Sequence, residues 1–156
     1  TAPKLPAIQH CSHQAEIMTG MEFDIFCDLD ATSPLRTVED ISSVLEIMEA
    51  GNCDNVITGT PANRSPYFNL VEETSKGFVQ VVKPMNPPLQ RRQDAPACHD
   101  CNASIYAWNR ETMFTLTEVI TPRTKLFVMP SERSRDIDSD LDFEIVEFLM
   151  RRREEM

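Results

Sequence analysis

Four carboxylates fall within the segment from Asp136 to Asp142, just before a stretch predicted to be a helix. Asp136 and Asp138 are separated only by Ile137, so in an extended segment both carboxylates share one face while Ile137 points into the core. Paired carboxylates suit a hard divalent cation. Mg²⁺ takes one or two of them and leaves its other positions to water and substrate phosphate. The alternative is an acidic loop that only caps the following helix.

Composition is typical of a soluble domain, with 41% hydrophobic and 26% charged residues in 156. The net charge of −10 argues against a nucleic-acid-binding surface, which needs a basic stripe. A phosphorylated small ligand would need local cations, either a metal or the Arg91-Arg92 pair. No apolar run is long enough for a membrane span, and no signal-peptide pattern opens the chain. We therefore predict a cytoplasmic protein that binds neither nucleic acid nor membrane.

The five cysteines are an odd number, which favours a reducing compartment. Cys98 and Cys101 have the spacing of half a zinc site, but no second pair completes the four ligands of a structural site. A redox motif of this spacing would open a helix, whereas a strand is predicted here. Neither zinc nor disulfide chemistry is favoured.

Hydrophobic periodicity and turn residues define the expected elements. Helices are predicted at 3–18, 37–50, 110–120 and 140–153, and strands at 23–29, 55–60, 68–71, 78–82, 104–108 and 125–129. The last helix should bury Leu141, Ile145, Phe148 and Leu149. Segment 84–100 is rich in proline and is predicted to leave the main sheet.

The alternation of strands and helices predicts an α/β three-layer fold with a mostly parallel sheet, in which strands 23–29 and 55–60 form a parallel βαβ pair. Ligands of such folds bind beyond the carboxyl ends of the strands. The loops 30–36 and 130–140 and the segment around Arg92 should therefore surround the site.

Five stretches, in order, resemble the acylneuraminate cytidylyltransferases, also called CMP-sialic acid synthetases. They are residues 28–36, 65–72, 92–96, 102–106 and 136–143. The first two look particularly like the bacterial branch that activates legionaminic acid. The resemblance runs from Thr1 to about Met150.

The resemblance implies a Rossmann-like nucleotidyltransferase fold and a reaction that joins CTP to a nine-carbon 2-keto sugar acid, giving the CMP-sugar and pyrophosphate. Asp136 and Asp138 inherit the Mg²⁺ site, and Arg92 is expected to meet the sugar carboxylate, which its guanidinium matches bidentately. The substrate pocket is expected to include Asp30, Thr32, Ser33, Arg36, Gln93, Asn102, Ser104 and Tyr106. Segment 84–100 corresponds to a protruding dimerisation arm, so a homodimer is expected.

Two departures from the family pattern affect these expectations. Asp100 stands near the position where many sialic acid relatives carry a second basic residue. The glycine- and lysine/arginine-rich loop that wraps the CTP phosphates in the family is also absent, since the four glycines lie far apart. The chain is therefore expected to be an N-terminally truncated, C-terminal portion of the fold that is inactive alone.

Several alternatives stay open. Arg36 could pair with Glu39 or Asp40, Tyr106 could only pack on the sheet, and Arg92 could be a solvated arm residue. The whole chain could be a non-catalytic sugar-binding or assembly module derived from the same fold. It could also perform the same chemistry on 3-deoxy-octulosonate or pseudaminate.

Overall fold

The computed structural model describes residues 3–155, with only the backbone of Glu154 included. The ends of the predicted domain 1–156, including Thr1, lie outside the described residues. The chain forms two compact units, one made of residues 1–59 and 101–156 and the other of residues 60–100. The predicted excursion 84–100 thus belongs to a larger unit that begins at Thr60.

The first unit is built on a four-stranded mixed sheet with the order β1-β5-β2-β6. These strands are β1 (Ile25–Leu29), β2 (Asn55–Pro61), β5 (His99–Asn109) and β6 (Thr124–Val128). β1 pairs antiparallel with β5, and β2 pairs parallel with β6. The prediction of a mostly parallel sheet is therefore wrong.

The predicted pairing of the strands at 23–29 and 55–60 is also wrong, because β5 lies between β1 and β2.

Within the second unit, the Ala62 N–H donates to the Cys98 carbonyl at 2.9 Å. The chain thus comes back beside the point where β2 ends.

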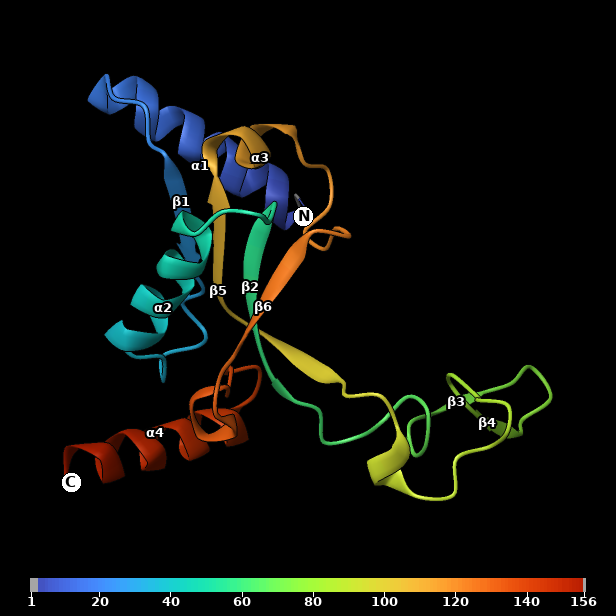
Figure 1. The fold of residues 1–156 in the computed structure, drawn as a ribbon. Coiled ribbons are helices and arrows are strands. Elements are labelled where there is room, and N and C mark those ends of the chain that lie inside the picture. The colour runs from blue at the N-terminus through green and yellow to red at the C-terminus, as the bar shows by residue number, and fades with distance from the viewer. Residues whose placement is uncertain (1–2, 156) are drawn as a thin grey trace. The chain divides into compact units, whose positions relative to one another are not determined.

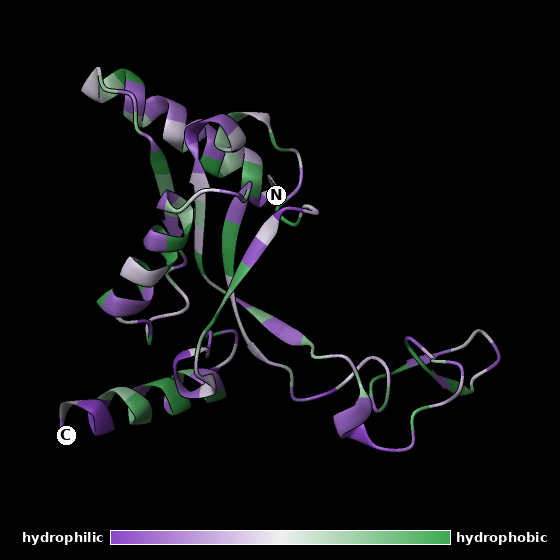
Figure 2. Ribbon diagram, in the orientation of Figure 1, coloured by the Kyte–Doolittle hydropathy of each residue, from purple (hydrophilic) through white to green (hydrophobic). Residues whose placement is uncertain are grey.

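Helices cover both faces of the sheet (Figure 1). α1 (Lys4–Thr19) and α3 (Arg110–Thr115) pack on one face and α2 (Val38–Glu49) packs on the other, and the fourth helix of this unit is α4 (Asp140–Glu154). On β5, Ile105 and Ala107 pack in a cluster with α2, whereas Trp108 packs with Leu5 of α1 and Met113 of α3. Alternate residues of one strand therefore serve opposite cores, as expected of three layers. Figure 2 shows hydrophobic residues along β1 and β2.

A local sequence signal explains the start of α2, whereas a contact with a distant residue explains the end of α3. The Thr37 hydroxyl accepts from the Asp40 amide while the Asp40 carboxylate accepts from the Thr37 amide, which is the capping box its sequence predicts. α3 ends at Thr115 rather than at Ile120. The Gln9 side-chain amide donates to the carbonyls of Met113 and Leu116 at 2.8 and 2.9 Å, which satisfies groups left open at that helix end.

The buried side predicted for α4 is wrong in part: Leu141 and Phe148 are exposed, Ile145 and Leu149 are half-buried, and Val146 is buried instead. The prediction assumed that the helix packs on the sheet. Instead α4 lies against the loop after β1, where Arg153 donates to the Leu35 carbonyl at 2.8 Å. Val146 shares a cavity with Ala31, Pro34 and Ile137.

The second unit contains the antiparallel strands β3 (Val71–Glu73) and β4 (Val79–Val81) and a short 3-10 turn, η1 (Arg92–Asp94). The predicted antiparallel pair around Ser75-Lys76-Gly77 is confirmed, but its first strand lies at 71–73 rather than at 68–71, and its second strand is shorter than the predicted 78–82. Within residues 3–155, no helix has the length and apolar character needed to cross a bilayer.

Candidate functional site

Three segments of the first unit meet beyond the end of β1. The Ile137 amide donates to the Thr32 carbonyl at 2.9 Å, so the acidic segment lies directly beside the loop 30–36. The Asn102 side-chain amide donates to the Ser134 hydroxyl at 3.0 Å, and the Ser33 hydroxyl donates to the Asn102 carbonyl at 3.2 Å. Two of the three segments predicted to surround the site, the loops 30–36 and 130–140, are therefore in contact, whereas the segment around Arg92 belongs to the unit 60–100.

Asp136 is half-buried and Asp138 exposed. Within residues 3–155, neither side-chain carboxylate has a hydrogen-bond or ion-pair partner. The cap of α4 is instead Ser139, whose hydroxyl accepts from the Asp142 amide at 3.3 Å and donates to the Asp142 carboxylate at 2.6 Å. The capping alternative thus applies to Ser139 and Asp142, and it leaves Asp136 and Asp138 available to a ligand.

The donor set fits Mg²⁺ better than a metal that needs a full protein cage. Among the described residues, no group of three or more His, Cys, Asp or Glu side chains converges as a metal site. Mg²⁺ accepts one or two carboxylates and keeps water or phosphate oxygens at its other positions. The cysteines are all free thiols, and the Cys98–Cys101 pair is not part of a converging cluster.

Arg36 organises the loop 30–36 through backbone carbonyls. Its Nη1 donates to the carbonyl oxygens of Asp30 at 2.7 Å, Ser33 at 2.6 Å and Ser104 at 3.3 Å. The alternative pairing of Arg36 with Asp40 is not observed, because Asp40 pairs with Arg133 instead. Arg36 thus ties the loop to β5.

The Asp40–Arg133 ion pair connects α2 to the turn η2 (Ser131–Arg133) that precedes the acidic segment. The two N···O distances are 2.7 and 2.9 Å, and Asp40 is only 2% exposed. Burial alone would raise the pKa of Asp40, but the Arg133 guanidinium and the Thr37 amide outweigh it and hold that pKa below its ordinary value. This bidentate contact fixes one end of the segment that carries Asp136.

Lys4 lies beside the candidate site residues Asp30 and Tyr106, and the sequence did not reveal this position. Its Nζ lies 2.9 Å from the Asp30 carboxylate, 3.3 Å from the Asp28 carboxylate and 4.4 Å from the centroid of the Tyr106 ring. Thr32 adds hydrogen bonds from its amide and hydroxyl to the Asp30 carboxylate, at 3.1 and 2.9 Å. The hydrogen bond from Lys4 and then those from Thr32 lower the pKa of Asp30 to about 2. Asp30 is therefore ionised at neutral pH.

Tyr106 packs against Trp108 and also lies beside the Lys4 ammonium group. Its ring stacks on Trp108 with centroids 5.7 Å apart, as the packing alternative anticipates. Its contact with Lys4 places Tyr106 in the same cluster as Asp30. Burial is the largest influence on its hydroxyl and raises its pKa.

Three predicted pocket residues are buried, one in the loop 30–36 and two on β5. Ser33, Asn102 and Ser104 have little or no exposed surface. The Asn102 side-chain carbonyl accepts from the Thr58 hydroxyl at 2.7 Å and from the Ser104 amide at 3.2 Å. The Ser104 hydroxyl has no hydrogen-bond partner within the described part of the chain. Direct substrate contact by these residues stays a prediction.

Arg92 and Gln93 belong to the unit 60–100, where both line a cleft of about 400 Å³. Arg92 lies in η1, is exposed, and donates from Nη2 to the Ala62 carbonyl at 3.1 Å. It is thus anchored at one end rather than fully solvated.

Known proteins show clear similarity to the chain, although no protein-family model matches it. It is 42% identical over 147 residues to CMP-N,N'-diacetyllegionaminic acid synthase of Campylobacter jejuni, covering 94% of the chain and 61% of that protein. It is 40% identical over 151 residues to post-translational flagellin modification protein B of Campylobacter coli, covering 97% and 63%. An N-acylneuraminate cytidylyltransferase of Streptococcus agalactiae is 29% identical over 119 residues, covering 76% and 28%. The chain thus spans roughly three fifths of the length of the two Campylobacter relatives.

Proposed function

The chain belongs to the acylneuraminate cytidylyltransferase family, in the branch of the legionaminic acid synthases. We therefore propose that it takes part in a cytidylyltransferase reaction. The substrates are CTP and a nine-carbon 2-keto sugar acid of the legionaminic or neuraminic type, and the products are the CMP-sugar and pyrophosphate. The proposed location is the cytoplasm, where the five free thiols stay reduced.

One observation carries the proposal: two carboxylates that have no partner among residues 3–155 lie on either side of Ile137, whose amide donates to the Thr32 carbonyl. Cation ligands and the loop expected to hold the sugar are thereby adjacent within the first unit. Phosphoryl transfer depends on positioning and on cancelling charge on phosphoryl oxygens, and this arrangement offers both.

In the proposed reaction, Asp136 and Asp138 hold Mg²⁺, which when bound neutralises charge on the nucleotide's phosphates. Asp30, kept ionised by Lys4 and Thr32, accepts hydrogen bonds from sugar hydroxyls and orients the ring. The anomeric hydroxyl releases its proton to solvent, and its oxygen forms a bond to the α-phosphorus as the bond to pyrophosphate breaks. Arg36 and Asn102 keep the loop in the conformation that presents Thr32.

The test is pyrophosphate release from CTP by the full-length protein that contains this chain, with legionaminic and neuraminic acids and Mg²⁺. Asp136→Asn and Asp138→Asn are each expected to lower kcat by about 100-fold or more, because metal charge stabilisation contributes several kcal/mol. Residues 1–156 alone are expected to show no turnover.

Ser139→Ala is the matched control. Loss of this cap should destabilise α4 by about 1 kcal/mol and leave the Mg²⁺ dependence unchanged. Full turnover in both aspartate variants would overturn the metal assignment. Absence of turnover with every sugar acid would favour the non-catalytic sugar-binding module.

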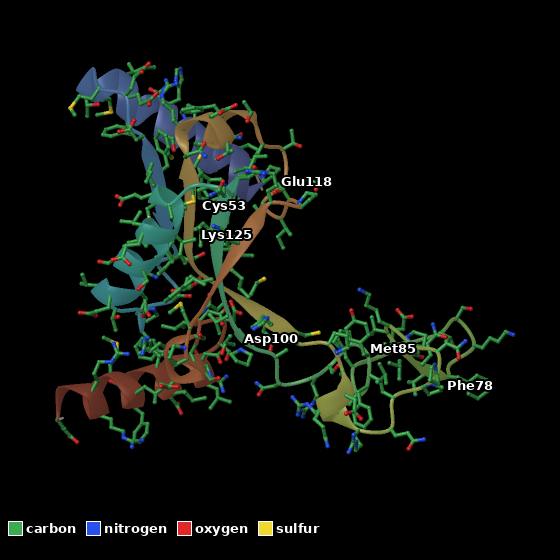
Figure 3. All side chains as sticks on the ribbon, viewed as in Figure 1. Cys53, Phe78, Met85, Asp100, Glu118 and Lys125 are labelled. Atoms are coloured by element: carbon green, nitrogen blue, oxygen red, sulfur yellow. The ribbon has the colours of Figure 1, made fainter. Side chains whose placement is uncertain are left out.

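A homodimer through the unit 60–100, including the arm 84–100, is also proposed. Phe78 and Val79 at the β3–β4 hairpin are 72% and 68% exposed, and Met85 in the arm is 39% exposed. Figure 3 labels Phe78 and Met85 on this unit. Exposed apolar side chains gathered in one small unit suit a protein interface.

A further inference from the structure

The cleft in the unit 60–100 has a positive lining in a chain whose net charge is −10. Arg64 and Arg92 both line it, together with Gln93 and His99, and no Asp or Glu is among its lining residues. A cleft of this character favours an anionic ligand.

Both guanidinium groups are held at one point of the chain. Arg92 donates from Nη2 to the Ala62 carbonyl, and Arg64 donates from Nη1 to the Asn63 carbonyl, each at 3.1 Å. These carbonyls belong to consecutive residues, and both arginines line the same cleft. A guanidinium has five N–H donors, and within residues 3–155 each of these two arginines donates one hydrogen bond to a backbone carbonyl.

Neither arginine has a carboxylate partner among the described residues. The adjacent Arg91 provides the contrast, since it binds Asp94 through two hydrogen bonds of 2.9 and 3.0 Å. The donors of Arg64 and Arg92 thus remain available, and a guanidinium fork matches a carboxylate in shape and charge.

Asp100 helps to place Arg64. Its carboxylate accepts a hydrogen bond from the Asn63 amide at 3.3 Å, and Asn63 immediately precedes Arg64 (Asp100 is labelled in Figure 3). The acidic residue found where a basic one was expected therefore binds backbone, and it is not part of the cleft lining.

From these contacts we infer that Arg64 is the second cation of a carboxylate clamp, binding the substrate's carboxylate together with Arg92 and selecting acidic sugars over neutral ones. The inference rests on the proposed function and adds a specificity-determining residue to it.

The test compares Arg64→Ala, Arg64→Lys and Arg92→Ala in the full-length protein. Arg64→Ala should raise KM for the sugar acid by about 10- to 100-fold, the range for losing charge-assisted hydrogen bonds, while KM for CTP stays unchanged. Arg64→Lys should recover only part of the loss, because an ammonium group cannot bind bidentately. Arg91→Ala, with its exposed pairing to Asp94, is the control and should change KM less than about twofold.

A second substrate isolates the carboxylate. With the methyl ester of the same sugar acid, Arg64→Ala and the unaltered protein should have the same KM. An equal effect on acid and ester, no effect on the acid, or a change in KM for CTP would overturn the inference. If the unaltered protein shows no turnover, the proposed function fails. Calorimetric titration with the sugar acid then decides the clamp, since Arg64→Ala must still weaken binding about 10-fold or more.

Discussion

Asp30 is the candidate residue whose charge state has the best-defined cause. Lys4 and Thr32 both donate to its carboxylate, so the residue expected to orient the sugar is an obligate acceptor at neutral pH. Lys4 also faces Asp28 and Tyr106, and a single ammonium group therefore balances two acids beside the loop. Replacing Lys4 should therefore change the pKa of Asp30 most directly.

Lys4→Met is expected to raise the pKa of Asp30 from about 2 toward the ordinary value of about 3.9. Because the folded-state pKa is the lower one, ionised Asp30 stabilises the fold above about pH 4, and that stabilisation is lost as pH falls toward 2. The variant should lose less stability over this window. Carboxyl carbon NMR titration measures the shift, with the exposed Lys83→Met as control; an unchanged pKa in Lys4→Met would contradict the account.

Candidate site segments could be identified from sequence only where their motifs were local. Thr32 and Asp136 follow from short motifs, and the backbone bond between their segments confirms that the segments meet. Lys4 could not be found, because it comes from the first turn of a helix and its contacts are 24 or more positions away. Nothing in the sequence around Lys4 distinguishes it from a solvated lysine.

At the scale of elements, the Asp40–Arg133 pair links α2 to the turn before the acidic segment. Arg133→Met is expected to lower the free energy of unfolding by about 3–5 kcal/mol, since it leaves a buried carboxylate unpaired. Urea denaturation measures the change. Arg135→Met, at an exposed position nearby, is the control and should stay within about 0.5 kcal/mol.

The pH dependence of this pair has a definite sign. Asp40 has a lowered pKa in the fold, so its stabilisation is present above the unfolded pKa near 3.9 and is lost as pH falls. Without Arg133, burial should raise the pKa of Asp40, and acidification should then relieve part of the penalty. Equal free energies of unfolding for Arg133→Met and Arg135→Met at pH 7 would show that the Asp40–Arg133 pair contributes nothing to stability.

Elements with local signals were predictable, and those set by distant partners were not. The start of α2 follows from Thr37 and Asp40, three positions apart. The end of α3 depends on Gln9, more than a hundred positions away. The buried side of α4 was not predicted correctly, because the helix carries several apolar residues and its packing surface buries Val146 while leaving others exposed.

For the whole molecule, the α/β class and the layers on both sheet faces followed from the order of elements, but strand order did not. The insertion of β5 between β1 and β2 leaves no local trace, because β5 carries apolar residues on both faces like any central strand. The unit 60–100 likewise reads from sequence as a proline-rich excursion plus a hairpin, whereas its compactness is a property of tertiary contacts.

The exposed apolar side chains of the unit 60–100 make the last prediction, which concerns assembly. If this unit forms the dimer, Phe78→Asp should raise the dimer dissociation constant by about 10- to 100-fold or more. Burial of a phenylalanine contributes about 1.5–3 kcal/mol, and a buried unpaired charge adds a further penalty. Sedimentation velocity over a concentration series measures the shift. Phe148→Asp on α4, where the side chain is 63% exposed, is the matched control and should leave the constant unchanged. A dimer lost in Phe148→Asp and kept in Phe78→Asp would assign the interface to α4 instead, and a monomeric unaltered protein would remove the arm's proposed role.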